Sequence, residues 1–321
     1  MPQALLANET GRPAVTIVGA GNIGVAFAVV FACAGAPVRV FDTGSDALRR
    51  LSPRISATLA DLQAAELLEE SPEAVAARVA PAAKLSEAVA GAAYIQECVP
   101  EIRTLKASVF AELDRLTASN VILASASSAM PVSEFASGLR GRRRCLVVHP
   151  GNPPFLLRVV EVVPAAFTDA AVVAQSCELL AAAGLATVLV RKEVKGFVFN
   201  RLQGAVLREA YCLVRDGVAS VEDIDRVVRD GLGLRWSVTG PFESVDLNTT
   251  GGIGRHAERL GPAYAEMGAE RGQRDPWTPA LVAEVEAQCR NRLPLSAWQQ
   301  RVRWRDRALM TLLAMRRGLM D

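Results

Sequence analysis

The strongest constraint in this sequence is a glycine-rich segment that directly follows a short run of β-branched residues. The run Ala14–Val18 predicts a buried strand, and an apolar helical pattern begins after the glycines. A strand, a GxGxxG turn and a helix in this order are typical of dinucleotide-binding folds, because each glycine lets backbone or phosphate come close. An ordinary glycine turn of an α/β protein is the alternative interpretation.

The glycine-rich segment supplies most of the expected cofactor-binding residues. Its amides precede a helix, where free N–H groups and the helix dipole favour anions. The expected phosphate-binding residues are Gly19, Ala20, Gly21, Asn22, Ile23 and Gly24. Asp42 ends the next expected strand, where a carboxylate accepts hydrogen bonds from the adenine ribose and repels a 2′-phosphate. No arginine stands among residues 43–45, so the sequence favours NAD over NADP.

Strand and helix patterns alternate as far as Glu193, and only helical patterns follow. This alternation predicts an α/β fold, with a doubly wound, mostly parallel Rossmann-type sheet and helices on both faces. We expect an NAD-binding domain over residues 1–193 and an all-α domain over residues 194–321. The expected strands are Ala14–Val18, Val38–Phe41, Tyr94–Cys98, Val121–Ser125, Cys145–His149, Val159–Val163 and Ala186–Val190. The expected helices are Ile23–Ala34, Ser45–Ala64, Ile102–Leu116, Thr168–Ala183, Gly196–Arg215, Ser220–Gly231, Pro279–Arg290 and Ser296–Arg317.

Composition narrows the partners and the compartment. The 36 Lys and Arg nearly balance the 34 Asp and Glu, so we expect neither nucleic acid nor a membrane surface as partner. No signal-peptide pattern and no apolar stretch of membrane-spanning length are visible, which favours a cytoplasmic protein. Six cysteines without a CxxC pair and only two histidines argue against a metal site.

The two histidines stand in different contexts. His149 ends an expected strand, and the segment Pro150–Pro154 then forces a reversal into the strand that carries Glu161. The reversal can bring Glu161 beside His149, where a carboxylate orients the imidazole and raises its basicity toward a substrate hydroxyl. A structural histidine at a strand end is the alternative. His256, in the helical domain, is expected to be structural or exposed.

Several longer strings resemble one known family. The sequence is similar to the 3-hydroxyacyl-CoA dehydrogenase superfamily, and within it to the branch of the L-gulonate 3-dehydrogenases or lambda-crystallins. The similarity extends over nearly the whole chain. The strings that carry it are 149–164, 96–101, 195–203, 230–236, 240–244 and 304–306.

The resemblance implies an NAD-dependent oxidation of a 3-hydroxyl group, with the matching histidine as general base and the matching glutamate orienting it. A serine and an asparagine that bind the reacting oxygen match Ser128 and Asn200. A glutamate and a lysine near the nicotinamide ribose match Glu101 and Lys106. Each match has an alternative interpretation. Ser128 could cap a helix, Asn200 could be a surface side chain, and Glu101 and Lys106 could form a solvated ion pair.

The substrate is the least determined feature. A free 3-hydroxy acid resembling L-gulonate needs a group that holds its carboxylate, and Arg235 is the first candidate, followed by Arg158. L-Carnitine is a related possibility, because Trp236 can contact a trimethylammonium group by a cation–π interaction. A short-chain 3-hydroxyacyl-CoA such as 3-hydroxybutyryl-CoA ranks lower, since residues 45–64 contain three arginines but no lysine cluster.

A non-enzymatic alternative also remains. The chain could be an NAD-binding structural protein of the crystallin kind, although the set of Ser128, His149, Glu161 and Asn200 argues against this interpretation. We further expect a homodimer formed through the apolar helices of residues 196–317, as the resemblance implies.

Overall fold

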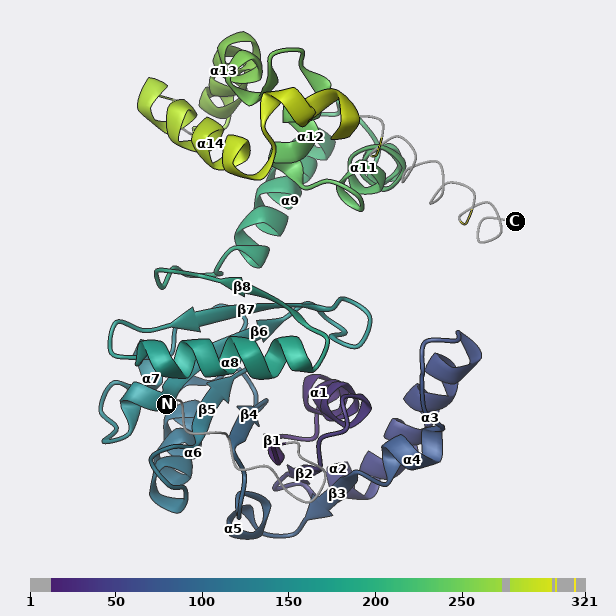
Figure 1. The fold of residues 1–321 in the computed structure, drawn as a ribbon, viewed down its shortest axis with the longest axis vertical. Helices are drawn as coiled ribbons and strands as arrows, with labels where there is room; N and C mark the ends of the chain where they lie inside the picture. Colours follow the sequence, from purple (N-terminus) through teal and green to yellow (C-terminus); the bar gives the residue numbers. More distant parts are fainter. Residues whose placement is uncertain (1–12, 273–277, 302–303, 305–314, 316–321) are drawn as a thin grey trace. The chain divides into compact units, whose positions relative to one another are not determined.

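The computed structural model describes residues 13–272, 278–301, 304 and 315. The chain divides into two compact units, residues 1–206 and 207–321, and the division falls inside helix α9 (Phe199–Arg215). The domain boundary expected from the sequence, at residue 193, precedes helix α9, whereas this division by contacts falls within the helix. The first unit is built on a sheet with flanking helices and the second is helical, which confirms the predicted fold class (Figure 1).

An eight-stranded sheet forms the centre of the first unit, in the order β3-β2-β1-β4-β5-β6-β7-β8. All neighbouring pairs are parallel except β6 and β7, which are antiparallel. The order β3-β2-β1-β4-β5-β6 is that of a doubly wound dinucleotide-binding sheet. The strands are β1 (Val15–Val18), β2 (Val38–Phe41), β3 (Val79–Ala82), β4 (Tyr94–Glu97), β5 (Ile122–Ser125), β6 (Cys145–Pro150), β7 (Val159–Pro164) and β8 (Ala186–Leu189).

Strand β3 is the one strand of the described chain that the sequence did not predict. It lies at the edge of the sheet and pairs only with β2. Its sequence VAPA contains Pro81, which cannot donate a ladder hydrogen bond and is tolerated only at such an edge. An exposed Ala80, an exposed Pro81 and a buried Ala82 give no strand pattern, so only the pairing with β2 reveals the strand.

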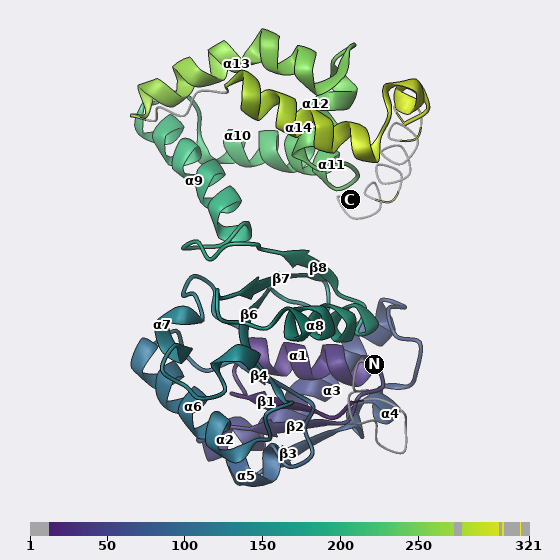
Figure 2. The same ribbon diagram turned by 60° about the vertical axis from the view of Figure 1, so that its left-hand side comes forward.

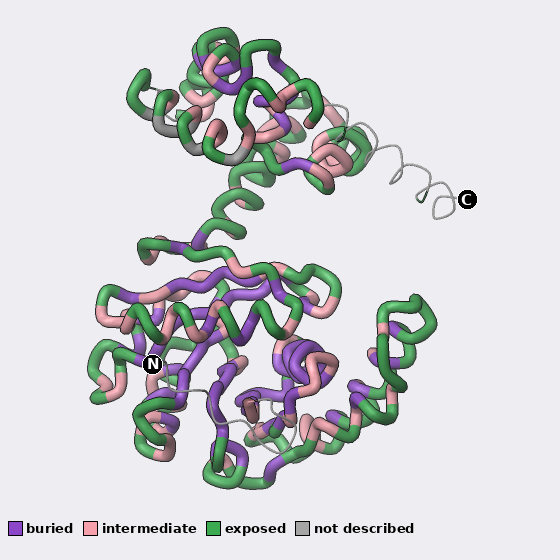
Figure 3. The backbone as a smooth tube through the Cα atoms, viewed as in Figure 1, coloured by how far each residue is buried: buried purple, intermediate pink, exposed green. Residues whose placement is uncertain are grey.

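Helices cover both faces of the sheet (Figure 2), and the strands are largely buried between them (Figure 3). Each face of the sheet has its own core. On one face, Phe27 and Leu180 pack against strand residues such as Val148. On the other, Phe110 packs with strand residues such as Val147. The first unit contains α1 (Asn22–Cys33), α2 (Ser45–Arg49), α3 (Leu51–Ala64), α4 (Pro72–Ala76), α5 (Leu85–Ala88), α6 (Arg103–Leu116), α7 (Ser133–Ala136), a 3₁₀ turn (Arg142–Arg144) and α8 (Ala170–Ala182).

The helix expected over Ser45–Ala64 is two helices, α2 and α3, that meet at Arg50. Pro53 is the reason, because it has no N–H group to bond to the carbonyl of Arg49 four residues earlier. The same proline is well placed in the first turn of α3, where that N–H would have no partner.

The regular elements of the second unit, within its described residues, are all helices joined by turns. The expected helix over Ser220–Gly231 is a short α-helix continued by a π-helical turn, and the helix expected over Ser296–Arg317 lies mostly outside the described residues. Helices α11, α12 and α13 were not predicted; in α13, glycines and Pro262 interrupt the apolar pattern. The unit contains α10 (Val221–Arg226), the π-helix (Val227–Leu232), α11 (Gly233–Trp236), α12 (Pro241–Asn248), α13 (Gly252–Glu270), α14 (Pro279–Arg292) and a 3₁₀ turn (Leu295–Ala297).

No helix in the described ranges combines the length and the apolar character that crossing a bilayer requires.

The close approach of α1 to β1 predicts the effect of a single methyl group. A β-carbon at Gly24 would lie 1.8 Å from the carbonyl oxygen of Gly19, and backbone cannot yield as a flexible side chain can. We expect Gly24→Ala to lower the free energy of unfolding by about 3 kcal/mol, at the upper end of overpacking costs. Urea unfolding followed by circular dichroism measures this loss.

Gly21→Ala is the matched control. A β-carbon there meets no other atom within 4 Å, so the variant should lose less than about 1 kcal/mol, a helix-capping effect. Equal losses in the two variants would contradict the close approach as the cause.

Candidate active site

The carboxyl ends of four parallel strands meet along one edge of the sheet. Strands β1, β4, β5 and β6 are mutually parallel neighbours, so the loops that follow them share this edge. Ligands of doubly wound folds bind outside this edge. The loops contain the glycine-rich turn, Glu101, Ser128 and the residues that follow His149.

The glycine-rich turn has the geometry that a dinucleotide requires. Gly19 has a φ of +110°, and a β-carbon there would lie 2.7 Å from the carbonyl oxygen of Cys98. Gly21, by contrast, borders open space, and the amides at the start of α1 follow it. The residues present therefore fit a diphosphate bound at the N-terminus of α1.

The Asp42 carboxylate is held by the same turn. Its Oδ2 accepts a hydrogen bond of 2.7 Å from the Ala20 amide, and its Oδ1 accepts one of 2.7 Å from the Gly44 amide. Asp42 thus stands at the end of β2, beside the glycine-rich turn, where a ribose with free hydroxyls fits better than a 2′-phosphate.

His149 and Glu161 face each other across the antiparallel pair of β6 and β7. They are direct partners in the register, and the Nδ1 atom of His149 lies 2.7 Å from Oε2 of Glu161. Both side chains are largely buried, and the imidazole packs against Phe197 and Phe199 at ring-centroid distances of 5.8 and 6.1 Å. The contact orients the imidazole and leaves its Nε2 atom for another partner.

Glu161 has a second set of partners that the sequence did not predict. Its Oε1 accepts hydrogen bonds from the amides of Val198 at 2.7 Å and Phe199 at 3.0 Å, at the start of α9. Burial alone would raise the pKa of Glu161, but the bond to His149 and these two amides outweigh it and lower the pKa. The carboxylate is therefore held in its charged form between the imidazole and a helix N-terminus.

Asn200 is tied to the loop that follows β5. Its Nδ2 atom donates a hydrogen bond of 2.7 Å to the carbonyl oxygen of Ser128. Glu101 stabilises the same loop. Its Oε1 accepts hydrogen bonds from the Ser127 hydroxyl at 2.6 Å and from the amides of Ser128 and Ala129 at 3.2 Å. The structure thus brings Ser128, Asn200 and Glu101 together around one loop.

The sequence left open a solvent-exposed ion pair between Lys106 and Glu101. In the structure Lys106 is buried instead. Its side chain is only 1% exposed, and its Nζ lies 2.9 Å from Oε1 of Glu97 but 3.8 Å from Glu101. Ser125 donates to Glu97 as well, at 2.5 Å. Burial, the largest influence, raises the pKa of Glu97 above its ordinary value, while Lys106 acts in the opposite direction.

The sequence analysis did not identify Glu97 as the partner of Lys106, although its position in the sequence is unusual. It is the one carboxylate within the apolar run Tyr94–Cys98, and it ends a central strand at the ligand-binding edge of the sheet. A charge in such a position must be paired, and Lys106 on the following helix is the paired cation.

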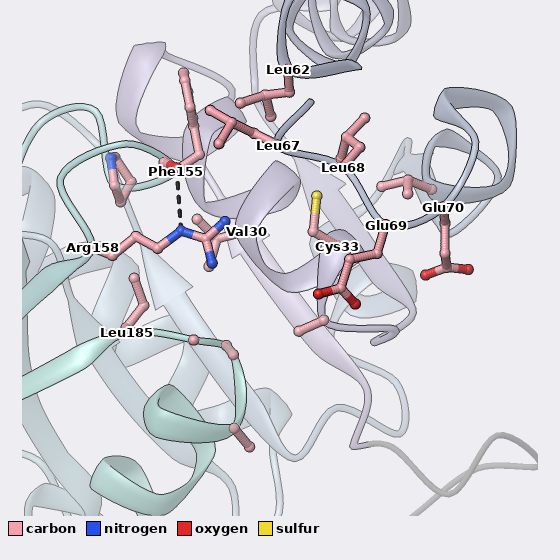
Figure 4. A pocket seen from close by; sticks show the side chains of 16 residues that line it. Val30, Cys33, Leu62, Leu67, Leu68, Glu69, Glu70, Phe155, Arg158 and Leu185 are labelled. Atoms are coloured by element: carbon pink, nitrogen blue, oxygen red, sulfur yellow. Dashed lines mark hydrogen bonds between the residues drawn. The ribbon is translucent and has the colours of Figure 1, made fainter. Parts of the chain in front are cut away.

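Arg158, one of the two substrate candidates, does not lie beside His149. Arg158 lies on the opposite face of the sheet and lines a separate pocket of about 200 Å³ with residues such as Cys33, Leu67 and Phe155 (Figure 4). This corrects the expectation for Arg158, and the alternation of side chains along β7 is the physical reason. Arg235 is half-buried in α11 of the second unit.

His256 is buried rather than exposed, within the second unit. Its Nδ1 lies 3.3 Å from the Thr249 hydroxyl, and its ring lies near that of Tyr264. Burial lowers the pKa of His256, and Arg259 adds to this effect. Within the described residues, no group of three or more potential ligands is placed to bind a metal ion.

Two family models together span most of the chain. The model of the 3-hydroxyacyl-CoA dehydrogenase NAD-binding domain matches residues 14–194, and the model of the C-terminal domain matches residues 196–291. The chain belongs to the 3-hydroxyacyl-CoA dehydrogenase family. The predicted membership is thereby confirmed, and so is NAD as the cofactor of an oxidoreductase.

Individual relatives agree with this membership. A lambda-crystallin homolog of Mus musculus is 37% identical over 305 residues, which cover 93% of this chain and 94% of the relative. An L-carnitine dehydrogenase of Streptomyces griseus is 35% identical over 286 residues, which cover 89% and 82%.

Among solved structures, the chain is similar to 5-formyl-3-hydroxy-2-methylpyridine 4-carboxylic acid 5-dehydrogenase, an NAD⁺-dependent dismutase. The TM-score is 0.72 at 26% identity, over 91% of this chain and 99% of the other.

The buried Glu97–Lys106 pair predicts a double-mutant cycle. Lys106→Met leaves the Glu97 carboxylate buried without its cation, and we expect a loss of about 3–5 kcal/mol in the free energy of unfolding at pH 7. The remaining carboxyl would have a folded-state pKa raised further above its unfolded value, so the loss should shrink as the pH falls toward 5.

The double variant Glu97→Gln/Lys106→Met should recover most of that stability, because it removes the uncompensated charge. Urea unfolding of all four proteins at pH 7 and 5 measures the coupling. Additive losses, or a loss independent of pH, would show that the two groups do not stabilise each other.

Proposed function

We propose that this chain oxidises the 3-hydroxyl of a small 3-hydroxy acid resembling L-gulonate to the 3-keto acid, with His149 as the general base. The observation that carries this proposal is the 2.7 Å contact of His149 Nδ1 with Glu161, at the ligand-binding edge of an NAD-binding sheet. With Nδ1 engaged, Nε2 is the atom that can accept the proton of a substrate hydroxyl.

The proton and the hydride leave the substrate by separate routes. NAD, when bound, supplies the acceptor for the hydride from the substrate carbon. His149 Nε2 takes the hydroxyl proton, and the remaining electrons of the O–H bond form the carbonyl of the product. The charged Glu161 beside the resulting imidazolium stabilises it, since opposite charges in hydrogen-bond contact favour both ionised forms.

Glu161 is suited to orient His149 because several hydrogen bonds fix its own carboxylate. One oxygen contacts the imidazole, and the other accepts from the amides of Val198 and Phe199. Rotation of the carboxylate would break several hydrogen bonds at once, so the imidazole keeps a single orientation. Ser128 and Asn200 are proposed to bind the reacting oxygen, as their matching positions in the family imply.

A free acid is favoured over a coenzyme A thioester by the arginines of residues 45–64. Arg49 is ion-paired with Asp46, and Arg54 is bonded to the glycine-rich turn. The charge of Arg49 is thus matched by Asp46, and Arg54 lies beside the turn where the diphosphate of NAD would bind, so neither is a separate cation for the phosphates of coenzyme A. The similarity to an L-carnitine dehydrogenase also supports a small free substrate.

Arg235 remains the proposed ligand of the substrate carboxylate. In the part of the chain that the structure describes, no carboxylate forms an ion pair with its guanidinium, and the side chain is half-exposed. A guanidinium of this kind can bind a carboxylate through two parallel hydrogen bonds.

A substrate screen tests the function and its base together. NADH formation, followed by absorbance, should be fastest with L-gulonate or another free 3-hydroxy acid among L-gulonate, 3-hydroxybutyrate, L-carnitine and 3-hydroxybutyryl-CoA. His149→Gln should lower kcat by about 10²- to 10⁴-fold, the usual contribution of a general base, with NADH affinity nearly unchanged.

His256→Gln is the control, because His256 is bonded within the second unit and should leave kcat within about twofold. A fully active His149→Gln enzyme would rule out the proposed base. Tight NADH binding without oxidation of any of the four compounds would instead favour the structural, crystallin-like alternative.

We also propose that the second unit forms a homodimer. Several of its apolar side chains are exposed, among them Tyr211 on α9 at 76% and Val218 in the turn after α9 at 66%, and clustered exposed apolar groups are typical of interfaces. Multi-angle light scattering should give twice the chain mass of 34.2 kDa. The variant Tyr211→Lys/Val218→Lys should be monomeric; a monomeric wild-type protein would contradict the proposal.

A further inference from the structure

Arg54 contacts the glycine-rich turn from a neighbouring helix. Its Nη1 donates a hydrogen bond of 2.9 Å to the Ala20 carbonyl, and its Nη2 donates one of 2.8 Å to Oδ1 of Asn22. Ala20 and Asn22 are the residues on either side of Gly21. The guanidinium therefore lies beside the glycine that borders open space at the start of α1.

The position of Arg54 is set by the hydrophobic core. Leu51, Ile55 and Leu59 of the same helix are each no more than 2% exposed, and they hold α3 against the sheet and α1. Arg54 itself is half-buried on the side of α3 that faces the turn. The cation is thus a fixed part of the first unit, unlike a freely moving surface arginine.

We propose that Arg54 is a further cofactor-binding residue, which contacts the diphosphate of NAD. A guanidinium has five N–H donors, and the two bonds to Ala20 and Asn22 leave donors for phosphate oxygens. Planar guanidinium groups bind phosphate through paired, charge-assisted hydrogen bonds, and partial burial strengthens the attraction. The open space at Gly21 is where the diphosphate approaches the backbone, directly beside this cation.

Neighbouring arginines do not share this position. Arg49 forms an ion pair with Asp46, and the Nε atom of Arg50 donates to the carbonyl of Asp46 at 3.3 Å. Both are exposed and bonded to their own short helix. Among the arginines of residues 45–64, which the structure describes in full, Arg54 alone is bonded to the glycine-rich turn.

The diphosphate fits these contacts better than the 2′-phosphate of NADP. The amide of Ala20 donates to Asp42 while its carbonyl accepts from Arg54, so the two charged groups hold opposite ends of one residue. The carboxylate would repel a phosphate on the ribose hydroxyls that it faces. A diphosphate at the start of α1 avoids Asp42 and meets both the helix N-terminus and Arg54.

Ligand binding without any substrate tests the proposal. NADH fluorescence titration gives its Kd, and displacement of NADH gives those of ADP, adenosine and NADPH. We expect Arg54→Gln, which keeps a hydrogen-bond donor but removes the charge, to raise the Kd of NADH and ADP about tenfold and leave that of adenosine unchanged. The salt dependence of ADP binding should also become shallower, because one charge contact is lost.

Two further variants complete the design. Arg49→Gln removes an equal charge from the adjoining helix and should change no Kd by more than about twofold. Arg54→Lys keeps the charge without the planar fork, so it should retain the salt dependence with part of the affinity. Arg54→Lys also keeps the test decisive should Arg54→Gln fold poorly, a point that thermal unfolding checks.

Three outcomes would overturn the assignment. Equal losses for ADP and adenosine would mean that Arg54 only supports the turn, and unchanged ADP binding would mean that it touches no phosphate. Wild-type preference for NADPH, abolished by Arg54→Gln, would move the contact to a 2′-phosphate. None of these measurements involves a 3-hydroxy acid, so their result is independent of the proposed substrate and base.

Discussion

The carboxylate of Glu161 connects strand β6 of the candidate active site with the start of helix α9. One oxygen contacts the imidazole of His149, and the other receives two amides from the N-terminus of α9, the helix that carries Asn200. The orientation of the imidazole and the entry of the chain into α9 therefore depend on the same charged group. Asn200 then reaches Ser128, so a single buried carboxylate links β6, β7, α9 and the loop after β5.

A second buried carboxylate has a comparable role on the cofactor side. Glu97 ends β4 and pairs with Lys106 below the loop that Glu101 fastens. A buried ion pair of this kind contributes little net stability compared with apolar packing, but removing one partner is costly. The pair therefore holds the loops after β4 and β5 in one arrangement, rather than strengthening the core.

Much of the first unit could be predicted because its signals are local. Strand runs such as Ala14–Val18 and the glycines after them are contiguous in sequence, and their meaning follows from steric rules that apply to any chain. His149 and Glu161 were predictable for the same reason, since a short reversal separates them. Arg158 and Lys106 were not, because their partners depend on which face of the sheet a residue takes and on segments distant in sequence.

The sequence by itself determined the fold class, the family, the cofactor and the proximity of His149 to Glu161. Only the tertiary structure decided the partners of each charge: Glu97 for Lys106, two helix amides for Glu161, and the glycine-rich turn for Arg54. The physical reason is that glycine geometry and hydrophobic periodicity act between near neighbours in the chain. The pairing of buried charges, by contrast, is set by which strands and helices become neighbours after the sheet has assembled.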